Sequence, residues 1–175
     1  MADDSTNEKL GTRPPGLDDL LLICRSLNER QARYVVIGGF AIFEHGLARL
    51  TDDLDLLIDS APANVARVKE ALECLPDQAS REVLDTDVAD FVVVRINDEI
   101  TVDLLASACG VSFTEAERYI ERRTIKGVEV PIASPALLWK TKQTWREKDA
   151  LDRSFLRKWF ADHGQEPPET GEGKR

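Results

Sequence analysis

One stretch decides the fold, residues 36–58, which read VIGGFAIFEHGLARLTDDLDLLI. Its first residues complete a short apolar, β-branched run over 34–37, which predicts a buried strand. Gly38 and Gly39 stop that run, and a short helix over 40–44 follows. Glycines between a strand and a helix allow backbone N–H groups to approach a phosphate, although a tight turn that needs positive φ would explain them equally well.

The second half of the stretch predicts a strand that carries two carboxylates. Asp53 and Asp55 are two residues apart, so they point to the same face, roughly 6.5–7 Å apart along the chain, while Leu54, Leu56 and Ile58 point into the core. Parallel carboxylates repel each other, and a hard divalent cation such as Mg²⁺ relieves that repulsion. An isolated Asp-x-Asp is nevertheless more typical of a solvated strand end.

Three neighbours strengthen the metal hypothesis. Asp103 lies in the middle of an apolar, β-branched strand, where an acid is costly to bury unless it is paired or metal-bound. On a strand beside Asp53 and Asp55 it would supply a third carboxylate; the alternative is a strand face open to water. Arg49 and Thr51 are placed to hold phosphate or to orient Asp53, and their alternatives are a surface cation and a strand-edge threonine.

Composition favours one ordinary globular domain. The chain has 175 residues, of which 42% are hydrophobic and 31% are charged. No apolar run of about 18 residues predicts a membrane span, and the acidic N-terminus is unlike a secretory signal, so we expect a cytoplasmic protein. The three cysteines, at positions 24, 74 and 109, match no zinc or redox motif, and we expect reduced, mostly buried thiols.

Charge is unevenly distributed along the chain. The net charge is −9, which argues against a protein that coats nucleic acid, but residues 118–158 contain 11 Lys and Arg against 5 Asp and Glu. A basic segment in an acidic protein could face phosphates, or it could complement the acidic half internally.

The remaining patterns predict an α/β or α+β fold, with a mixed sheet and flanking helices in a single domain. A flexible arm is expected over 1–16, the folded domain over 17–164, and a disordered tail over 165–175. The expected elements are a helix over 17–29, a helix from Pro62, a hairpin of 91–96 with 100–105, a helix over 112–122, a hairpin over 124–132 that turns at Lys126 and Gly127, a helix after Ser134, and a last helix that begins near Thr144 and Glu147 and buries Leu151, Phe155 and Trp159.

The other aromatic and histidine residues carry weaker signals. Two histidines, His45 and His163, exclude a histidine-rich metal site, and His45 fits helix packing better than catalysis. Trp139, Trp145 and Trp159 fit core or helix packing better than base stacking.

The stretch resembles the nucleotidyltransferases of the DNA polymerase β superfamily, whose signature is a glycine turn, Asp-x-Asp and a later third aspartate. The finer resemblance is to the prokaryotic branch related to the AbiEii toxins and minimal nucleotidyltransferases. It is carried by Gly38-Gly39, by His45-Gly46, by Arg49 to Asp55, and again by residues 137–149 with Asp152.

This resemblance implies the nucleotidyltransferase fold and a set of roles. Asp53, Asp55 and Asp103 would bind Mg²⁺ or Mn²⁺, and Gly38, Gly39, Arg49, Thr51 and Lys142 would bind the nucleoside triphosphate. Lys142 corresponds to the family lysine, with Lys140 as the second candidate, and we expect it to face the glycine turn across a cleft.

The implied activity is transfer of a nucleoside monophosphate from the triphosphate to an acceptor: RNA such as tRNA, a protein or a small molecule. A toxin–antitoxin role with a protein partner is implied as well. A different hypothesis is a non-catalytic nucleotide-binding or regulatory module with a degenerate site, and a third is a structural protein with a fortuitous motif.

Overall fold

The computed structural model describes residues 11–170, which form a six-stranded mixed sheet flanked by helices. The helices are α1 (Leu17–Glu29), α2 (Gly38–Glu44), α3 (Pro62–Leu72), α4 (Asp87–Phe91), α5 (Phe113–Ala116), α6 (Pro135–Thr141) and α7 (Glu147–Asp162), with 3-10 turns at Ala79–Glu82 and Glu117–Tyr119. The strands are β1 (Tyr34–Val36), β2 (Asp53–Ile58), β3 (Val93–Asn97), β4 (Thr101–Leu105), β5 (Ser107–Ala108), β6 (Val111–Ser112), β7 (Ile120–Ile125) and β8 (Val128–Ala133).

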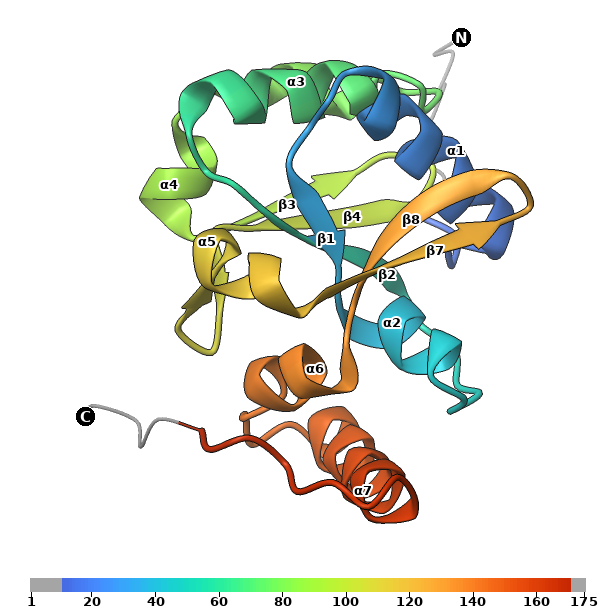
Figure 1. Cartoon of the computed structure of the whole chain (residues 1–175). Helices are drawn as coiled ribbons and strands as arrows, with labels where there is room; N and C mark the ends of the chain where they lie inside the picture. Colours follow the sequence, from blue (N-terminus) through green and yellow to red (C-terminus); the bar gives the residue numbers. More distant parts are fainter. Residues whose placement is uncertain (1–10, 171–175) are drawn as a thin grey trace, which may run out of the picture.

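The sheet has the strand order β3-β4-β2-β1-β8-β7, and β5 with β6 forms a separate short hairpin. β2 is parallel to β4 and antiparallel to β1, while β1 is parallel to β8. Figure 1 shows α1 and α3 over one face of the sheet, with α6 and α7 on the opposite side. The predicted class, a mixed sheet with flanking helices, is therefore confirmed.

Local sequence accounts for most of these elements. Both predicted hairpins form, as β3–β4 and β7–β8. The second turns at Lys126 and Gly127, with φ values of 47° and 79°, because two left-handed residues match the twist of the flanking strands. α6 begins where the Ser134 hydroxyl accepts a hydrogen bond from the Leu137 N–H at 3.3 Å.

The core lies between the sheet and the helices α1 and α3. Leu54, Leu56 and Ile58 of β2 are fully buried, as the alternation predicted, and belong to the same hydrophobic core as the apolar residues of α1. The opposite face of β2, which carries the two aspartates, is therefore left for the candidate site.

Several local predictions are wrong. The helix expected over 112–122 ends at Ala116, because Ile120 already pairs with Ala133 in the β7–β8 ladder. Of the cysteines, Cys24 is buried, whereas Cys74 and Cys109 are exposed thiols.

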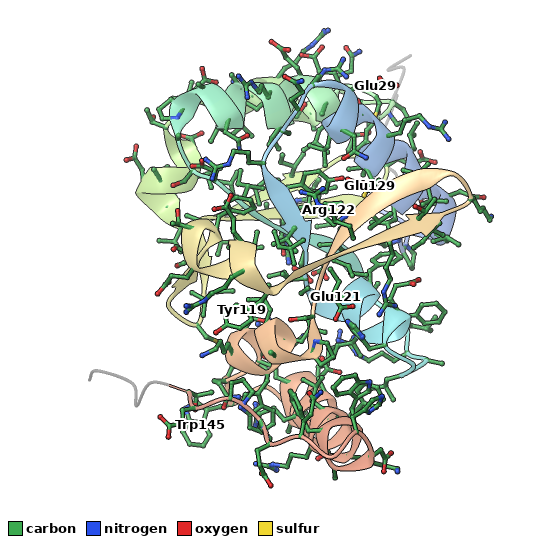
Figure 2. All side chains as sticks on the ribbon, viewed as in Figure 1. Glu29, Tyr119, Glu121, Arg122, Glu129 and Trp145 are labelled. Atoms are coloured by element: carbon green, nitrogen blue, oxygen red, sulfur yellow. The ribbon has the colours of Figure 1, made fainter. Side chains whose placement is uncertain are left out.

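The last helix buries the predicted face only in part, since Phe155 and Trp159 pack half-buried against the core but Leu151 does not. Leu151 is 66% exposed, whereas Asp149 and Asp152 are buried beside Leu156 and Phe160. Trp145, just before this helix, is fully exposed, and Figure 2 shows it below α6, away from the sheet. Its expected place in the core is therefore wrong.

The predicted domain limits stay predictions. Residues 1–10 of the expected arm and 171–175 of the expected tail lie outside the described residues. Residues 11–16 form neither helix nor strand, but the Arg13 side chain donates hydrogen bonds to Asp19 at 2.7 and 2.8 Å and to Glu99 at 3.0 Å. No helix within residues 11–170 has the length and apolarity that a bilayer span requires.

Candidate active site

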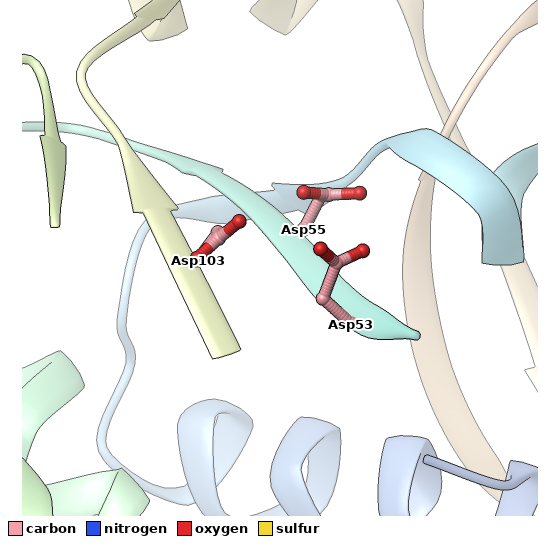
Figure 3. Close-up of side chains that lie close together, drawn as sticks. All are labelled: Asp53, Asp55 and Asp103. Carbon is pink, nitrogen blue, oxygen red and sulfur yellow. The ribbon is translucent and has the colours of Figure 1, made fainter. Parts of the chain in front are cut away.

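Three aspartates meet on the face of the sheet that α1 and α3 leave uncovered. Asp53 and Asp55 extend from β2, and Asp103 lies directly opposite Asp55 on the parallel neighbour β4. Carboxylate oxygens of all three lie within 4.8 Å of one another, and Figure 3 shows the three side chains converging. The expected position of Asp103 beside the Asp-x-Asp pair is what the structure contains.

Burial and like charge both disfavour the ionised form of Asp55. The pKa of Asp55 is raised to about 7, first by burial and then by the negative charges of Asp53 and Asp103; Lys142 and Arg146 oppose the shift. Burial and like charge both penalise the ionised carboxylate, and a bound divalent cation would relieve both. The donor set of three carboxylates suits a hard, oxygen-preferring cation such as Mg²⁺ or Mn²⁺.

Gly38 and Gly39 lie against this cluster for steric reasons. Gly38 has a φ of +67°, and a Cβ there would overlap the Asp55 carboxylate. A Cβ on Gly39 would come within 2.7 Å of the Thr51 side chain. The glycine pair is thus required for the close approach of the turn to β2, whatever else it binds.

Thr51 and Arg49 are held by specific partners in the loop before β2. The Thr51 hydroxyl donates a hydrogen bond to the Asp53 carbonyl at 2.9 Å, so it orients the main chain at the start of the strand. Arg49 donates two hydrogen bonds to the fully buried carboxylate of Asp152, from Nε at 2.9 Å and from Nη2 at 2.8 Å. This bidentate pair anchors α7 to the loop that precedes the aspartates.

Lys142 takes part in the same ion-pair network. Its Nζ lies 2.9 Å from Asp152 and 3.1 Å from Asp149, and the side chain is largely buried. Burial raises the pKa of Asp149, but the hydrogen bond from Thr144 and the charge of Lys142 outweigh it, so that the pKa is lowered. The network holds two cations, Arg49 and Lys142, in fixed positions beside the acid cluster.

These groups line one cavity of about 150 Å³. The aspartates and the glycine turn contribute to it from the sheet and α2, whereas Lys142 and Arg146 contribute from the segment that joins α6 to α7, and Lys148 from the first turn of α7. The segment therefore does fold back on the glycine turn, as expected. Lys140, the second candidate, does not line the cavity and instead donates a hydrogen bond to the Glu169 carbonyl at 3.0 Å.

Sequence reasoning missed Arg95, which is the cation closest to the acids. It lies on β3 opposite Asp103 and donates hydrogen bonds to both oxygens of that carboxylate and to Asp53. The hairpin was predicted, but its predicted strand limits, 91–96 and 100–105, place residue 95 opposite residue 101, whereas the observed register pairs it with residue 103.

His45 packs rather than lining the cavity. Its Nε2 lies 2.8 Å from the Ala133 carbonyl, and its Nδ1 lies 3.2 Å from the Arg123 guanidinium. Burial is the main cause of a lowered pKa at His45. The packing interpretation of this histidine therefore agrees with its surroundings.

Comparison with known proteins adds one distant likeness. No family model matches the chain, and no curated protein matches it either. Among solved structures, a candidate nucleotidyltransferase from Thermotoga maritima is similar over 83% of this chain and 92% of its own, with 14% sequence identity and a TM-score of 0.49. At this level of similarity, neither activity nor substrate can be transferred from one protein to the other.

Proposed function

We propose that this chain is a nucleotidyltransferase that requires Mg²⁺ or Mn²⁺ and transfers a nucleoside monophosphate from a triphosphate to an acceptor hydroxyl. The observation that supports this best is one cavity that combines three converging carboxylates with the cations Arg49, Lys142, Arg146 and Lys148. A triphosphate with its cations needs both signs of charge, because acids hold the metal and bases hold the remaining phosphate oxygens.

In the proposed reaction, the acceptor hydroxyl releases its proton to solvent and its oxygen forms a bond to the α-phosphorus. The bond from that phosphorus to the oxygen that bridges the α and β phosphates breaks, and pyrophosphate leaves. A divalent cation bound there would act as a Lewis acid on the triphosphate and lower the pKa of the acceptor hydroxyl. Asp53 and Asp55 would hold the cation that binds the triphosphate, and Asp103 would add a third carboxylate ligand.

The remaining proposed roles concern the triphosphate. Lys142 offsets charge on its phosphates, since lysine presents a compact positive charge on a flexible stem, and Arg49 assists. Gly38 and Gly39 allow the main chain to approach the β and γ phosphates, and Thr51 keeps the start of β2 in place. These assignments are supported by the position of each residue on the cavity wall.

We further propose that the chain belongs to the prokaryotic branch related to AbiEii toxins, and that it works in the cytoplasm, with residues 17–164 as the catalytic domain. Support comes from the motif from Arg49 to Asp55 and from Asp149 and Asp152, whose side chains hold Lys142 and Arg49. In this role the acceptor would be RNA, a protein or a small molecule, and an antitoxin would be the protein partner.

The test measures pyrophosphate release and transfer of label from α-³²P nucleoside triphosphates, with Mg²⁺ or Mn²⁺. Acceptors are bulk tRNA, total cellular protein and a panel of small hydroxyl compounds. Asp53→Asn should abolish transfer, whereas Asp85→Asn, a matched change of an acid outside the cavity, should retain it. Activity of Asp53→Asn within a few-fold of the unsubstituted protein would show that the site is wrong.

A second candidate function is a nucleotide-binding module without catalysis. It is favoured by the engagement of Lys142 with Asp149 and Asp152, and of Arg95 with Asp103, since these cations are already paired. Metal-dependent triphosphate binding without pyrophosphate release, for every nucleotide and acceptor tried, would favour this function over the enzyme.

A further inference from the structure

Arg95 differs from every other cation of the cavity in the acids that it contacts. Its Nε donates to Asp103 Oδ1 at 2.8 Å, and its Nη2 donates to Asp103 Oδ2 at 2.7 Å and to Asp53 Oδ2 at 3.1 Å. Arg49 instead pairs with Asp152, and Lys142 pairs with both Asp149 and Asp152, which lie outside the triad.

We propose that Arg95 is an internal counter-ion of the aspartate cluster, which competes with a divalent cation for Asp103 and Asp53 and must release them before they can bind it. This inference rests on the proposed function, because the cation site belongs to that function. It makes Arg95 a positioning residue that sets the affinity of the site for metal.

Arg95 occupies the carboxylate oxygens that a divalent cation would need. Both oxygens of Asp103 and one oxygen of Asp53 accept hydrogen bonds from a single guanidinium. A cation of the Mg²⁺ type binds such oxygens at about 2.0–2.1 Å and demands a near-ideal arrangement of them. A guanidinium in contact with the same oxygens would also repel the incoming double charge, so the two cations exclude each other.

The Arg95 side chain is free to leave the two aspartates and enter solvent. β3 is the edge strand of the sheet, and the Arg95 side chain is 56% exposed, whereas that of Asp103 is only 9% exposed. The guanidinium has no hydrogen-bond acceptor other than Asp103 and Asp53 among the described residues, so it can swing into solvent without disturbing packed neighbours. Arg49, at 19% exposure and anchored to Asp152, lacks that freedom.

Arg95 neutralises the charge of the three aspartates unevenly. Arg95 neutralises part of the charge on Asp103 and Asp53 but makes no hydrogen bond to Asp55. The arginine therefore holds the two outer carboxylates in a convergent geometry while leaving the central carboxylate open to the cavity. Its exchange for a divalent cation would keep that geometry and extend the neutralisation to all three acids.

The test is calorimetric titration of the full chain with Mn²⁺, in the absence of nucleotide, for the unsubstituted protein, Arg95→Gln and Arg95→Lys. Arg95→Gln should bind Mn²⁺ roughly ten times more tightly, because one competing bidentate charge-assisted contact is lost. Arg95→Lys should lie between the two, since it keeps the charge without the planar fork. Arg33→Gln is the matched control, because Arg33 is also a half-exposed arginine that bridges two acids, but it lies outside the cavity; its affinity for Mn²⁺ should be unchanged.

An independent measurement follows the Nε–H of Arg95 by NMR, with its cross-peak identified by its disappearance in Arg95→Lys. Addition of Mg²⁺ should shift this signal or broaden it by faster exchange as the guanidinium leaves Asp103. Equal or weaker Mn²⁺ affinity in Arg95→Gln, or a cross-peak that saturating Mg²⁺ does not change, would overturn the inference while leaving the metal site in place. Absence of Mn²⁺ binding in every protein would instead overturn the proposed function itself.

Discussion

Replacement of Asp55 by asparagine should make the protein more stable at high pH in the absence of metal. The pKa of Asp55 is raised from 3.8 to about 7, mainly by burial and by its two acidic neighbours. Between these two pH values the folded state holds a proton that the unfolded state has released. The free energy of unfolding therefore falls as the pH rises from about 4 to about 7, and the loss is complete above that range.

The size of the effect follows from the shift. About three pKa units correspond to about 4 kcal/mol, at about 1.4 kcal/mol per unit. Asparagine carries no charge and has nearly the same shape, so Asp55→Asn should recover about 2–4 kcal/mol at pH 8, the lower figure allowing for desolvation of the amide. At pH 5 the folded carboxyl is still protonated while the unfolded one has already ionised, so only about a third of the loss has occurred and the gain should be about 2.5 kcal/mol smaller than at pH 8.

The assay is urea denaturation in EDTA at pH 5 and pH 8. Asp52→Asn is the control, because Asp52 is the adjacent residue but its side chain is exposed, and this variant should change little at either pH. Added Mg²⁺ should stabilise the unsubstituted protein at pH 8 and have a much smaller effect on Asp55→Asn. A gain of the same size at both pH values, or no gain at pH 8, would refute the explanation by a raised Asp55 pKa.

Three further predictions test the glycine turn, the ion-pair network and the third acid. Gly38→Ala should weaken Mn²⁺ binding in calorimetry and lower the midpoint of thermal unfolding, because the new methyl group overlaps the Asp55 carboxylate. Gly46→Ala is the control, because Gly46 also has a positive φ but has open space around it; it should lower the midpoint of thermal unfolding and leave Mn²⁺ binding unchanged. Lys142→Ala should destabilise the chain in urea by less than the roughly 3–5 kcal/mol of an uncompensated buried charge, because Asp152 keeps Arg49 and Asp149 keeps Thr144 and Arg146. It should also weaken triphosphate binding, and a triphosphate affinity equal to that of the unsubstituted protein would restrict Lys142 to a structural role. Asp103→Asn should abolish pyrophosphate release while the circular dichroism spectrum is retained, and measurable turnover would exclude Asp103 from the metal site.

Local sequence was sufficient for the pair Asp53 and Asp55, and for an acid at position 103 within a strand, because these predictions use short-range rules. Alternation along β2 determines that Asp53 and Asp55 share a face. The hairpin of β3 and β4 places Asp103 in the middle of a second strand. The glycine turn is likewise a local signal, since Gly38 requires a positive φ. What local rules leave open is which strands are neighbours, and only the sheet order places β4 beside β2.

The tertiary structure alone decided how the last helix packs. Apolar spacing predicted that Leu151 would be buried, yet α7 turns Asp149 and Asp152 inward and leaves Leu151 exposed. The reason is that Arg49, about a hundred residues away in the sequence, and Lys142, which is nearby, both form ion pairs with the Asp152 carboxylate. Hydrophobic periodicity predicts only which apolar side chains are removed from water. A buried charge is stable only beside an opposite charge, and the folding of the whole chain decides which charges become neighbours.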